Sequence, residues 1–520
     1  MMMRWIIYGV VLAICSLAPG RSFAARPQHH VVLIIWDGMR PDFVTEAATP
    51  TLASLAASGV TFENHHPVYP SSTEVNGTAL FTGLYPGHSG IIGNAEYRPA
   101  INQTRAVNTE NPATMAAGDA QTHGHYLAGP TVPEWLRRSG KTTAVAGAKG
   151  VALLADRSPR SKLDSPPVFF GGATLPSQLA AFLTGQIGEF PEAVAEKPTR
   201  NDWTTSALLT NFWERGVPDF SVLWMNQPDL AQHRTGVGSE HSLAALRNND
   251  ENLGRVLAEL DRRGVRADTD VLIVSDHGFS TISAVVDVAD SLQTAGLDVR
   301  RLSGGTQTPG EVVVVGNGGS VMIYVREHRE ATIRKVVEFL QGWNRTGVIF
   351  TRNPIRGAFS LSAVHIDSAE APDVVLSLRW TAERNDAGAP GMIFSDPSGY
   401  GAGQGMHATL SRFDMHNTLI AAGPDFRRGV VDHLPTGNVD IAPTIYRILE
   451  VKPPKSLDGR VLSEALTIDG PKIKSFEPRH LEATATNAQG GWKQYLNFTE
   501  VNGVDYFDEG NGAQPAVQSP

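Results

Sequence analysis

Three apolar runs along the chain share one pattern, because each ends abruptly in carboxylates, imidazoles or chain breakers. They are HHVVLIIWDG (residues 29–38), FSVLWMNQPD (220–229) and TDVLIVSDHG (269–278). Uninterrupted apolar runs of this length are typical of parallel strands covered on both faces. Between the last two, residues 242–260 repeat leucine and valine at helical spacing after Ser242, which predicts a capped amphipathic helix. This alternation predicts a doubly wound, mostly parallel α/β sheet.

The character of the sequence changes between residues 286 and 394. A Gly-rich segment is followed by an alternating strand pattern, a helical pattern and another strand, at residues 302–319, 320–325, 331–343 and 372–380. This mixture predicts a smaller α+β cap inserted into the α/β core. The core would then comprise residues 25–285 and 395–470, and residues 471–520 would form a small hairpin with a frayed end.

The first 24 residues have the features of a secretory signal peptide. Arg4 precedes an apolar run at residues 5–18, and Ser22-Phe23-Ala24 forms a small-residue cleavage site. A membrane anchor is the alternative, but the run is shorter than the roughly 20 residues that span a bilayer. We therefore expect cleavage near Ala24, a periplasmic or secreted protein, and no stable membrane insertion after cleavage.

Cysteine content and charge narrow the classes of function. The only cysteine, Cys15, lies inside the predicted signal, so any metal site in the mature chain must use oxygen and nitrogen ligands. The formal charge of −9 becomes two units more negative once Arg4 and Arg21 are removed. A nucleic-acid duplex is therefore not an expected partner.

Candidate metal ligands cluster where the predicted strands end. In doubly wound sheets ligands bind beyond the carboxyl ends of the strands, and the four-residue spacing in QPDLAQH places two side chains on one helical face. Three aspartates and three histidines without cysteine suit zinc. They are Asp37, Asp229, His233, Asp276, His277 and, in the Gly-rich GAGQGMHAT, His407. Other loop histidines, His123, His125, His416 and His433, are interpreted as ordinary residues.

A candidate nucleophile lies in YPSSTEVNGTALFTG (residues 69–83), where hydroxyls and turn formers lead into a helical pattern. A hydroxyl is a weak nucleophile at neutral pH, but zinc lowers the pKa of bound water to about 7 and acts similarly on an alcohol. The amides at a helix N-terminus also favour an anion. Thr73 is our candidate nucleophile.

These motifs resemble the alkaline phosphatase superfamily, specifically its type I phosphodiesterase/nucleotide pyrophosphatase branch. The matching pieces, from about residue 30 to residue 465, are WDGMRPD, STEVNGTALFTGLYP, HSGIIGNAEY, QPDLAQH, SDHGF, GMH and GNVDIAPTIYRIL with DGR. The resemblance implies an alkaline-phosphatase-like core and two zinc ions per chain. It implies in-line attack by Thr73 on a small phosphate ester and a phosphoryl-threonine that water hydrolyses.

Site residues carried over from the resemblance divide between the two ions. One would be held by Asp37, Thr73, Asp276 and His277, and the other by Asp229, His233 and His407. Asn94 matches the residue that donates a hydrogen bond to a non-bridging phosphoryl oxygen.

The substrate class rests on three further residues. Glu74 stands where the branch commonly has an aromatic that stacks on a nucleobase, and Trp224 is a second candidate for stacking or a core residue. Lys149 matches a lysine of zinc phosphomonoesterases, although Val151 stands where their arginine would fall, and a solvated loop lysine is the alternative. Phosphodiester or pyrophosphate hydrolysis is the first interpretation, with phosphomonoester hydrolysis as the alternative.

Phosphonate hydrolysis and phospholipid head-group cleavage are further possibilities. A non-catalytic binding protein is disfavoured because no ligand or nucleophile is missing. A sulfatase is excluded because no Cys or Ser stands in the Pro- and Arg-bearing motif that those enzymes need.

Overall fold

A computed structural model of the chain describes residues 29–194, 197–300, 311–455, 457–487 and 490–514. The predicted signal peptide lies outside these residues. The largest sheet has nine strands in the order β22-β2-β21-β10-β1-β9-β6-β7-β8. The strands are β1 (His30–Trp36), β2 (Val60–Phe62), β6 (Thr143–Gly147), β7 (Val168–Phe170), β8 (Ala173–Leu175), β9 (Phe220–Met225), β10 (Thr269–Val274), β21 (Leu419–Ala422) and β22 (Val430–Asp432).

The three apolar runs form the middle of this sheet, as the sequence predicts. β1 pairs in parallel with β10 on one side and β9 on the other, with Val31 opposite Asp270 and Phe220. β6 extends the parallel set beyond β9, whereas β21 pairs antiparallel with β10. Because the five neighbouring strands β10, β1, β9, β6 and β7 point the same way, their carboxyl ends meet at one edge, where the polar residues that follow them gather.

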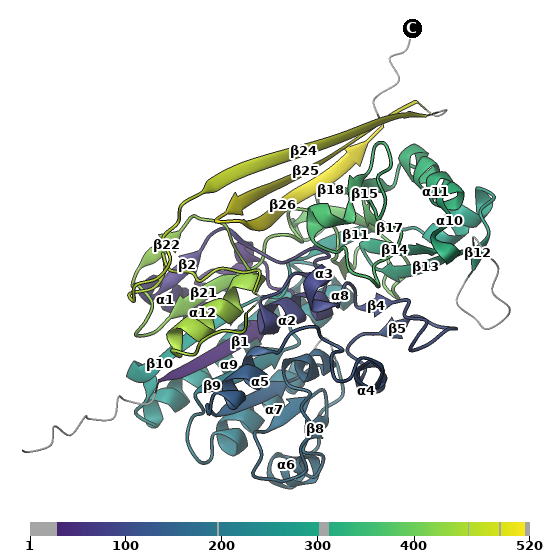
Figure 1. The fold of residues 1–520 in the computed structure, drawn as a ribbon. Coiled ribbons are helices and arrows are strands. Elements are labelled where there is room, and N and C mark those ends of the chain that lie inside the picture. The colour runs from purple at the N-terminus through teal and green to yellow at the C-terminus, as the bar shows by residue number, and fades with distance from the viewer. Residues whose placement is uncertain (1–28, 195–196, 301–310, 456, 488–489, 515–520) are drawn as a thin grey trace, which may run out of the picture.

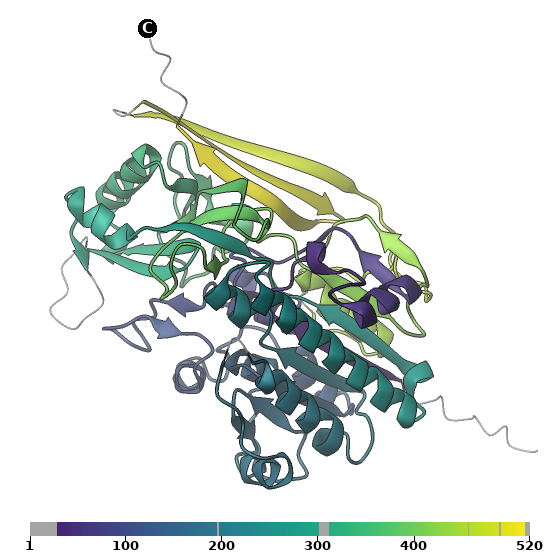
Figure 2. The ribbon, with the colours of Figure 1, turned by 180° about the vertical axis from the view of Figure 1, so that it is seen from behind.

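Helices cover both faces of the sheet, which confirms the doubly wound α/β architecture. Alternate side chains of β1 face opposite ways: Leu33 belongs to the core layer beneath α2 (Thr73–Thr82), α5 (Val132–Arg138) and α12 (Ile441–Ile448). Ile34 belongs to the layer beneath α1 (Pro50–Ser58) and α9 (Glu240–Arg262). Figure 2 shows α9 lying along the rear face. This helix begins earlier than predicted, because Ser239 rather than Ser242 is its cap and accepts a hydrogen bond from the Ser242 amide.

The predicted insert contains a second, six-stranded sheet in the order β12-β13-β14-β17-β15-β16. Its elements are β12 (Val299–Arg300), β13 (Val312–Asn317), β14 (Ser320–Val325), β15 (Thr346–Thr351), β16 (Phe359–Ser360), β17 (Val374–Leu378), α10 (Val288–Thr294) and α11 (Glu330–Gly342). A separate four-stranded sheet has the strand order β18-β19-β11-β20. It is built from β11 (Ser280–Val285), β18 (Trp380–Arg384), β19 (Pro390–Ser395) and β20 (Gly405–Met406), so it joins strands from inside and outside the predicted insert.

The C-terminal region differs from the expected small hairpin and frayed end. It forms a three-stranded antiparallel sheet of β24 (Phe476–Asn487), β25 (Gly490–Val501) and β26 (Val504–Ala513), drawn in yellow at the top of Figure 1. Tyr506 packs into the core layer of the main sheet, and Phe507 packs with Phe350 of the insert. Ala485 is the one buried residue of β24 among those described, and the alternation of Leu481, Ala483 and Ala485 with polar residues is short, so the sequence marks this strand only weakly.

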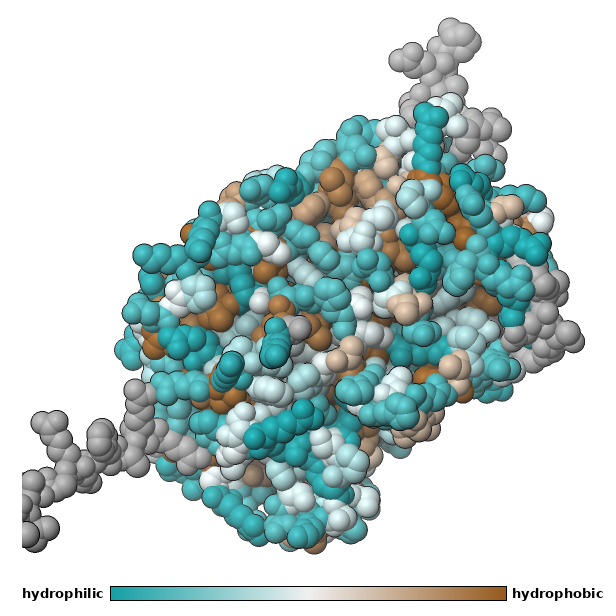
Figure 3. All heavy atoms as spheres, in the orientation of Figure 1, coloured by the Kyte–Doolittle hydropathy of each residue, from teal (hydrophilic) through white to brown (hydrophobic). Residues whose placement is uncertain are grey.

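The remaining helices and short strands connect these layers. They are α3 (Pro86–Ser89), α4 (Pro112–Gln121), α6 (Leu179–Ile187), α7 (Thr199–Ser206), α8 (Asp229–Thr235), β3 (His65–His66), β4 (Ala95–Glu96), β5 (Val107–Asn108) and β23 (Thr436–Gly437). On the face drawn in Figure 3 apolar residues are scattered among hydrophilic ones. In the described part of the chain, every helix is too short or too polar to cross a membrane.

Candidate metal centre and active site

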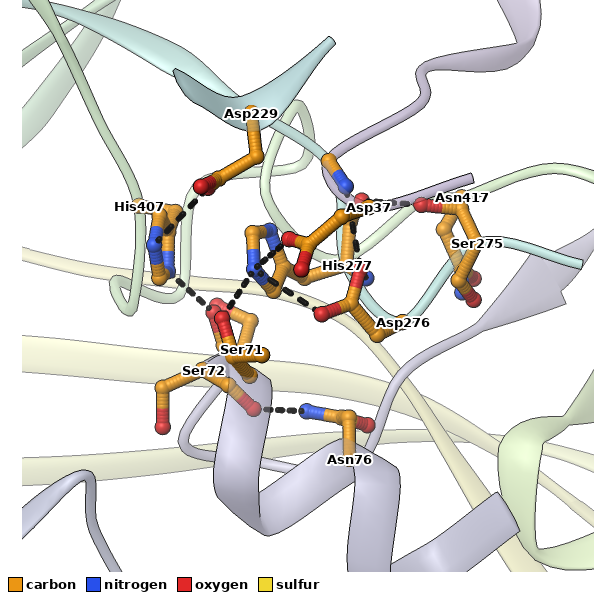
Figure 4. Close-up of polar contacts among 12 residues, drawn as sticks. Asp37, Ser71, Ser72, Asn76, Asp229, Ser275, Asp276, His277, His407 and Asn417 are labelled. Carbon is orange, nitrogen blue, oxygen red and sulfur yellow. Dashed lines mark hydrogen bonds and ion pairs between the residues drawn. The ribbon is translucent and has the colours of Figure 1, made fainter. Parts of the chain in front are cut away.

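The candidate ligands and nucleophile meet at the carboxyl edge of the main sheet. Asp37 follows β1, Asp229 and His233 lie on α8 just beyond β9, and Asp276 and His277 follow β10. His407 follows β20 and Thr73 begins α2, which brings two distant segments to the same edge. Figure 4 shows Asp229 and His407 on one side, with Asp37, Asp276 and His277 on the other. These residues are between 0% and 9% exposed.

Two overlapping groups have the spacing of metal sites. Asp229, His233 and His407 each offer a ligand atom within 4.8 Å of the others, and so do Asp37, Asp229 and His277. Asp276 extends the second group, since its Oδ2 lies 3.3 Å from His277 Nε2. Asp229 therefore stands between two adjacent sets of oxygen and nitrogen donors.

The three histidines are oriented as metal-binding imidazoles are. In His233, His277 and His407, Nδ1 lies 2.9 Å from a backbone carbonyl. These carbonyls belong to Gly405, Gly278 and Ser71, respectively. A carbonyl only accepts, so each Nδ1 carries the proton, and burial lowers the pKa of His277 to about 3, which keeps that ring neutral. Each Nε2 therefore carries a lone pair that points at a carboxylate oxygen, and the two atoms repel each other. A cation bound between them would remove this repulsion.

Each of the three carboxylates also has one oxygen without a hydrogen-bond partner in the described part of the chain. Asp37 Oδ1, Asp229 Oδ1 and Asp276 Oδ2 are buried without a hydrogen-bond partner among the described residues. Burial and the charge of Asp229 raise the pKa of Asp37 to about 6, and burial and Asp37 raise that of Asp276 well above its usual value. Buried carboxylates are stable when paired or bound to metal. The donor set therefore fits divalent cations that prefer oxygen and nitrogen ligands.

Lys149 lies inside this cluster rather than in solvent. Its Nζ is 3.0 Å from Asp37 Oδ2, 3.2 Å from Thr73 Oγ1 and 3.3 Å from Asp229 Oδ2. Burial opposes its charge, but the carboxylates of Asp229 and Asp37 outweigh burial and hold the pKa of Lys149 well above its usual value. The interpretation as a solvated loop lysine is therefore wrong. Lys149 follows β6 just as the aspartates follow their strands, and that position is the sequence signal for it.

Thr73, the candidate nucleophile, lies at a helix N-terminus. Its Oγ1 lies 3.2 Å from His277 Nε2, and its main chain starts α2, whose N-terminus favours an anion. The next amide, that of Glu74, donates to Asn94 Oδ1 over 3.1 Å. This bond fixes the side-chain amide of Asn94 with its NH₂ group as the available donor.

Trp224 has a different role from the expected contact with substrate. The residue is completely buried in β9, its ring packs 5.9 Å from that of Phe81, and its indole N–H donates to Asp37 Oδ2 over 2.9 Å. A fully buried ring cannot stack on a ligand, so the expectation that Trp224 binds substrate is wrong. Trp224 orients a candidate metal ligand instead.

Trp224→Phe is expected to weaken metal binding about 10-fold, because it removes a hydrogen bond to a ligand and keeps the aromatic packing. Metal affinity measured by chelator competition checks this. Trp36→Phe is the matched control, since Trp36 is equally buried and its Nε1 has no hydrogen-bond partner among the described residues. Equal affinity in the two variants would contradict the orienting role.

Glu74 is buried as well, with 3% of its surface exposed and Oε2 lacking a hydrogen-bond partner in the described structure. Burial and the nearby carboxylate of Glu110 raise the pKa of Glu74 well above its usual value. Sequence reasoning missed Glu110, which lies in the polar loop before α4, where neither a strand end nor a motif marks it. A substrate contact by Glu74 stays a prediction.

A family model described as "Type I phosphodiesterase / nucleotide pyrophosphatase" matches residues 31–388. The chain belongs to this family. The match confirms the resemblance recognised in the motifs, and it spans the strand ends, the Thr73 segment and most of the insert.

Individual relatives are distant. A venom phosphodiesterase of Naja atra is 23% identical over 260 residues, covering 49% of this chain and 27% of that protein. The rat ectonucleotide pyrophosphatase/phosphodiesterase family member 7 is 22% identical over 275 residues, covering 53% of this chain and 55% of that protein. The matched region of this chain thus spans about a quarter of the length of the venom enzyme.

Solved structures share the fold. Murine ectonucleotide pyrophosphatase/phosphodiesterase 5 superposes with a TM-score of 0.60 at 15% identity, covering 84% of this chain and all of that one. An inactive threonine-to-alanine variant of the same murine protein, in complex with AMP, has a TM-score of 0.59 at 16% identity, with 84% of this chain covered.

Proposed function

We propose that this protein is an exported, zinc-dependent phosphodiesterase or nucleotide pyrophosphatase that hydrolyses small phosphate esters through a phosphoryl-threonine. One observation carries the proposal: buried carboxylate oxygens without partners and three histidine Nε2 atoms converge beside Thr73. Membership of the family and the AMP complex of the structural neighbour support the substrate class.

The candidate ligands would hold two zinc ions in the division that the resemblance implies. Asp37, Asp276, His277 and Thr73 form one set, and Asp229, His233 and His407 form the other. When bound, zinc supplies positive charge that favours an ionised alcohol and stabilises the phosphoryl oxygens in the transition state.

The protein's own groups would position the ester. The NH₂ group of Asn94 would donate to a non-bridging oxygen beside the N-terminus of α2, so that the phosphorus faces Thr73 Oγ1. Thr73 Oγ1 loses its proton as the Oγ1–P bond forms, and the bond to the leaving oxygen breaks in line with it, so that the leaving group departs with a proton on that oxygen. Water subsequently attacks phosphorus from the vacated side and the Oγ1–P bond breaks. One proton of this water returns to Thr73 Oγ1, and its hydroxyl stays on the phosphate.

A phosphomonoesterase is the second candidate, and Lys149 favours it. A monoester carries one more negative charge than a diester, and the ammonium of Lys149 lies within 3.2 Å of the candidate nucleophile. The burial of Trp224 also removes one of the aromatic rings that could have stacked on a nucleobase.

Turnover of three synthetic esters separates the two candidates. We expect higher kcat/KM for a nucleoside nitrophenyl diester and for a bis-nitrophenyl diester than for a nitrophenyl monoester. A strong preference for the monoester would replace the first candidate by the second. Failure on all three esters with zinc bound would contradict both.

Lys149→Met tests the lysine directly. If the ammonium contacts the additional charge of a monoester, the variant should lose about 100-fold in kcat/KM for the monoester and much less for the diesters. Lys141→Met is the control, since Lys141 lies before the same strand and pairs with Asp219, at the opposite edge of the sheet. Equal losses on monoester and diester would exclude selective recognition of the monoester by Lys149.

A further inference from the structure

A second cluster of metal-ligating side chains lies outside the candidate active site, where the C-terminal sheet meets the core. His66 ends the short strand β3, His416 precedes β21, and Asp508 belongs to β26. Their ligand atoms lie within 4.8 Å of one another. His66 Nε2 and His416 Nε2 are 3.1 Å and 3.9 Å from the same oxygen, Asp508 Oδ1.

The orientation of His66 repeats that of the candidate zinc ligands. Its Nδ1 lies 3.1 Å from the backbone carbonyl of Thr436, so Nδ1 donates and Nε2 is left with a lone pair when the ring is neutral. That lone pair faces a carboxylate oxygen, and His66 is 1% exposed. A simple ion pair would require a charged imidazolium in a buried place, whereas a cation between the groups satisfies both.

The neighbouring histidine shows how a residue at this interface is satisfied without a cation. His65 is equally buried, but its Nδ1 lies 2.8 Å from the Thr436 hydroxyl and its Nε2 lies 3.0 Å from the Asn438 side-chain oxygen. A hydroxyl both donates and accepts, so one neutral tautomer satisfies both nitrogens of His65. No neutral tautomer satisfies both nitrogens of His66, because the Thr436 carbonyl and the Asp508 carboxylate both accept hydrogen bonds.

We propose that His66, His416 and Asp508 bind one divalent cation of the zinc class, separate from the two at the candidate active site. In a tetrahedral zinc site with bonds of about 2.0 Å, ligand atoms lie about 3.3 Å apart. The observed separations approach this value, and small rotations of His416 and Asp508 would complete the geometry, since each is about 30% exposed. Two imidazoles and one carboxylate match the ligand preference of zinc.

The fourth coordination position is available to solvent. His416 and Asp508 also line a cavity of about 750 Å³ between the core and the C-terminal sheet, together with Arg40, Arg412 and Arg479. The cavity gives the cation access and room for a water ligand.

The bound cation would link the C-terminal sheet to the segment between His66 and Thr73, the candidate nucleophile. His66 precedes Thr73 by seven residues, and Asp508 lies in the last strand of the sheet. Other contacts hold the same interface, since the Tyr506 hydroxyl donates to Asp440 over 2.9 Å and the Tyr85 hydroxyl donates to the Asp505 carbonyl over 2.8 Å. Removal of the cation should therefore loosen the sheet without unfolding the chain.

Zinc content of the whole protein tests this site. After equilibrium dialysis against micromolar zinc, we expect His416→Ala and Asp508→Asn each to hold one zinc ion fewer per chain than the unsubstituted protein. Both variants should retain ester turnover and show a lower unfolding temperature in zinc. His88→Ala is the matched control, because His88 also lies 2.9 Å from an aspartate, Asp458, but lacks a second histidine among the described neighbours.

The outcomes decide the proposal independently of the proposed function, because zinc content is counted whether or not the protein hydrolyses an ester. Equal zinc content in the unsubstituted protein, His416→Ala and Asp508→Asn would overturn it. The proposal would also be overturned if the control variant His88→Ala lost one zinc ion per chain.

Discussion

Thr73→Ala is expected to abolish ester turnover, with a loss of about 10⁴-fold or more, while the protein keeps its fold and most of its zinc. The reason is that Thr73 Oγ1 is the hydroxyl at the centre of the cluster, 3.2 Å from both His277 Nε2 and Lys149 Nζ. The six other candidate ligands are unchanged in this variant. Steady-state turnover, circular dichroism and zinc content check the prediction.

Thr73→Ser is the matched variant for this experiment. It keeps a hydroxyl at the same position and should retain measurable turnover, with a covalent phosphoryl-serine trapped on acid quench. A Thr73→Ala protein that still hydrolyses esters at the original rate would exclude Thr73 as the nucleophile.

Asp229→Asn is expected to produce the second largest effect, a loss of about 10³-fold in turnover together with weaker binding of zinc. Among the described residues, only Asp229 has ligand atoms within 4.8 Å both of His233 with His407 and of Asp37 with His277, so one substitution disturbs both groups. The neutral amide also removes the charge that most strongly supports the ammonium of Lys149. Turnover and zinc affinity, measured on the same preparation, test the expectation.

The control is Asp219→Asn, on the opposite edge of the same sheet. Asp219 immediately precedes β9 and pairs with Lys141, whereas Asp229 follows that strand. The two variants change the same functional group at the two ends of one strand. Loss of zinc in both, or in neither, would contradict a metal site confined to the carboxyl edge.

The sequence predicts the central sheet and the convergence of the candidate ligands at one of its edges, because both follow from one physical rule. Val31 to Ile35 and their counterparts in β9 and β10 are buried on both faces, so they form uninterrupted apolar runs. Parallel neighbours bring the residues that follow each run to one edge, so Asp37, Asp229 and Asp276 can be grouped before any coordinates are known.

Residues whose roles depend on packing were harder to predict. Trp224 stands in an apolar strand where the sequence allows either a core ring or a stacking ring, and only its burial beside Asp37 decides between them. Glu110 lies in a polar loop, and only the fold places its carboxylate near that of Glu74. The sequence gives no sign that His416 lies beside His66, because this proximity arises where the segment before β21 packs against β3 and the Asn417 amide donates to the His65 carbonyl.

Diffraction from crystals of the active protein, recorded on both sides of the zinc absorption edge, tests the central claim most directly. The account predicts two anomalous peaks beside Thr73, one among Asp37, Asp276 and His277 and the other among Asp229, His233 and His407. Turnover-competent crystals without anomalous density at this edge of the sheet would contradict it.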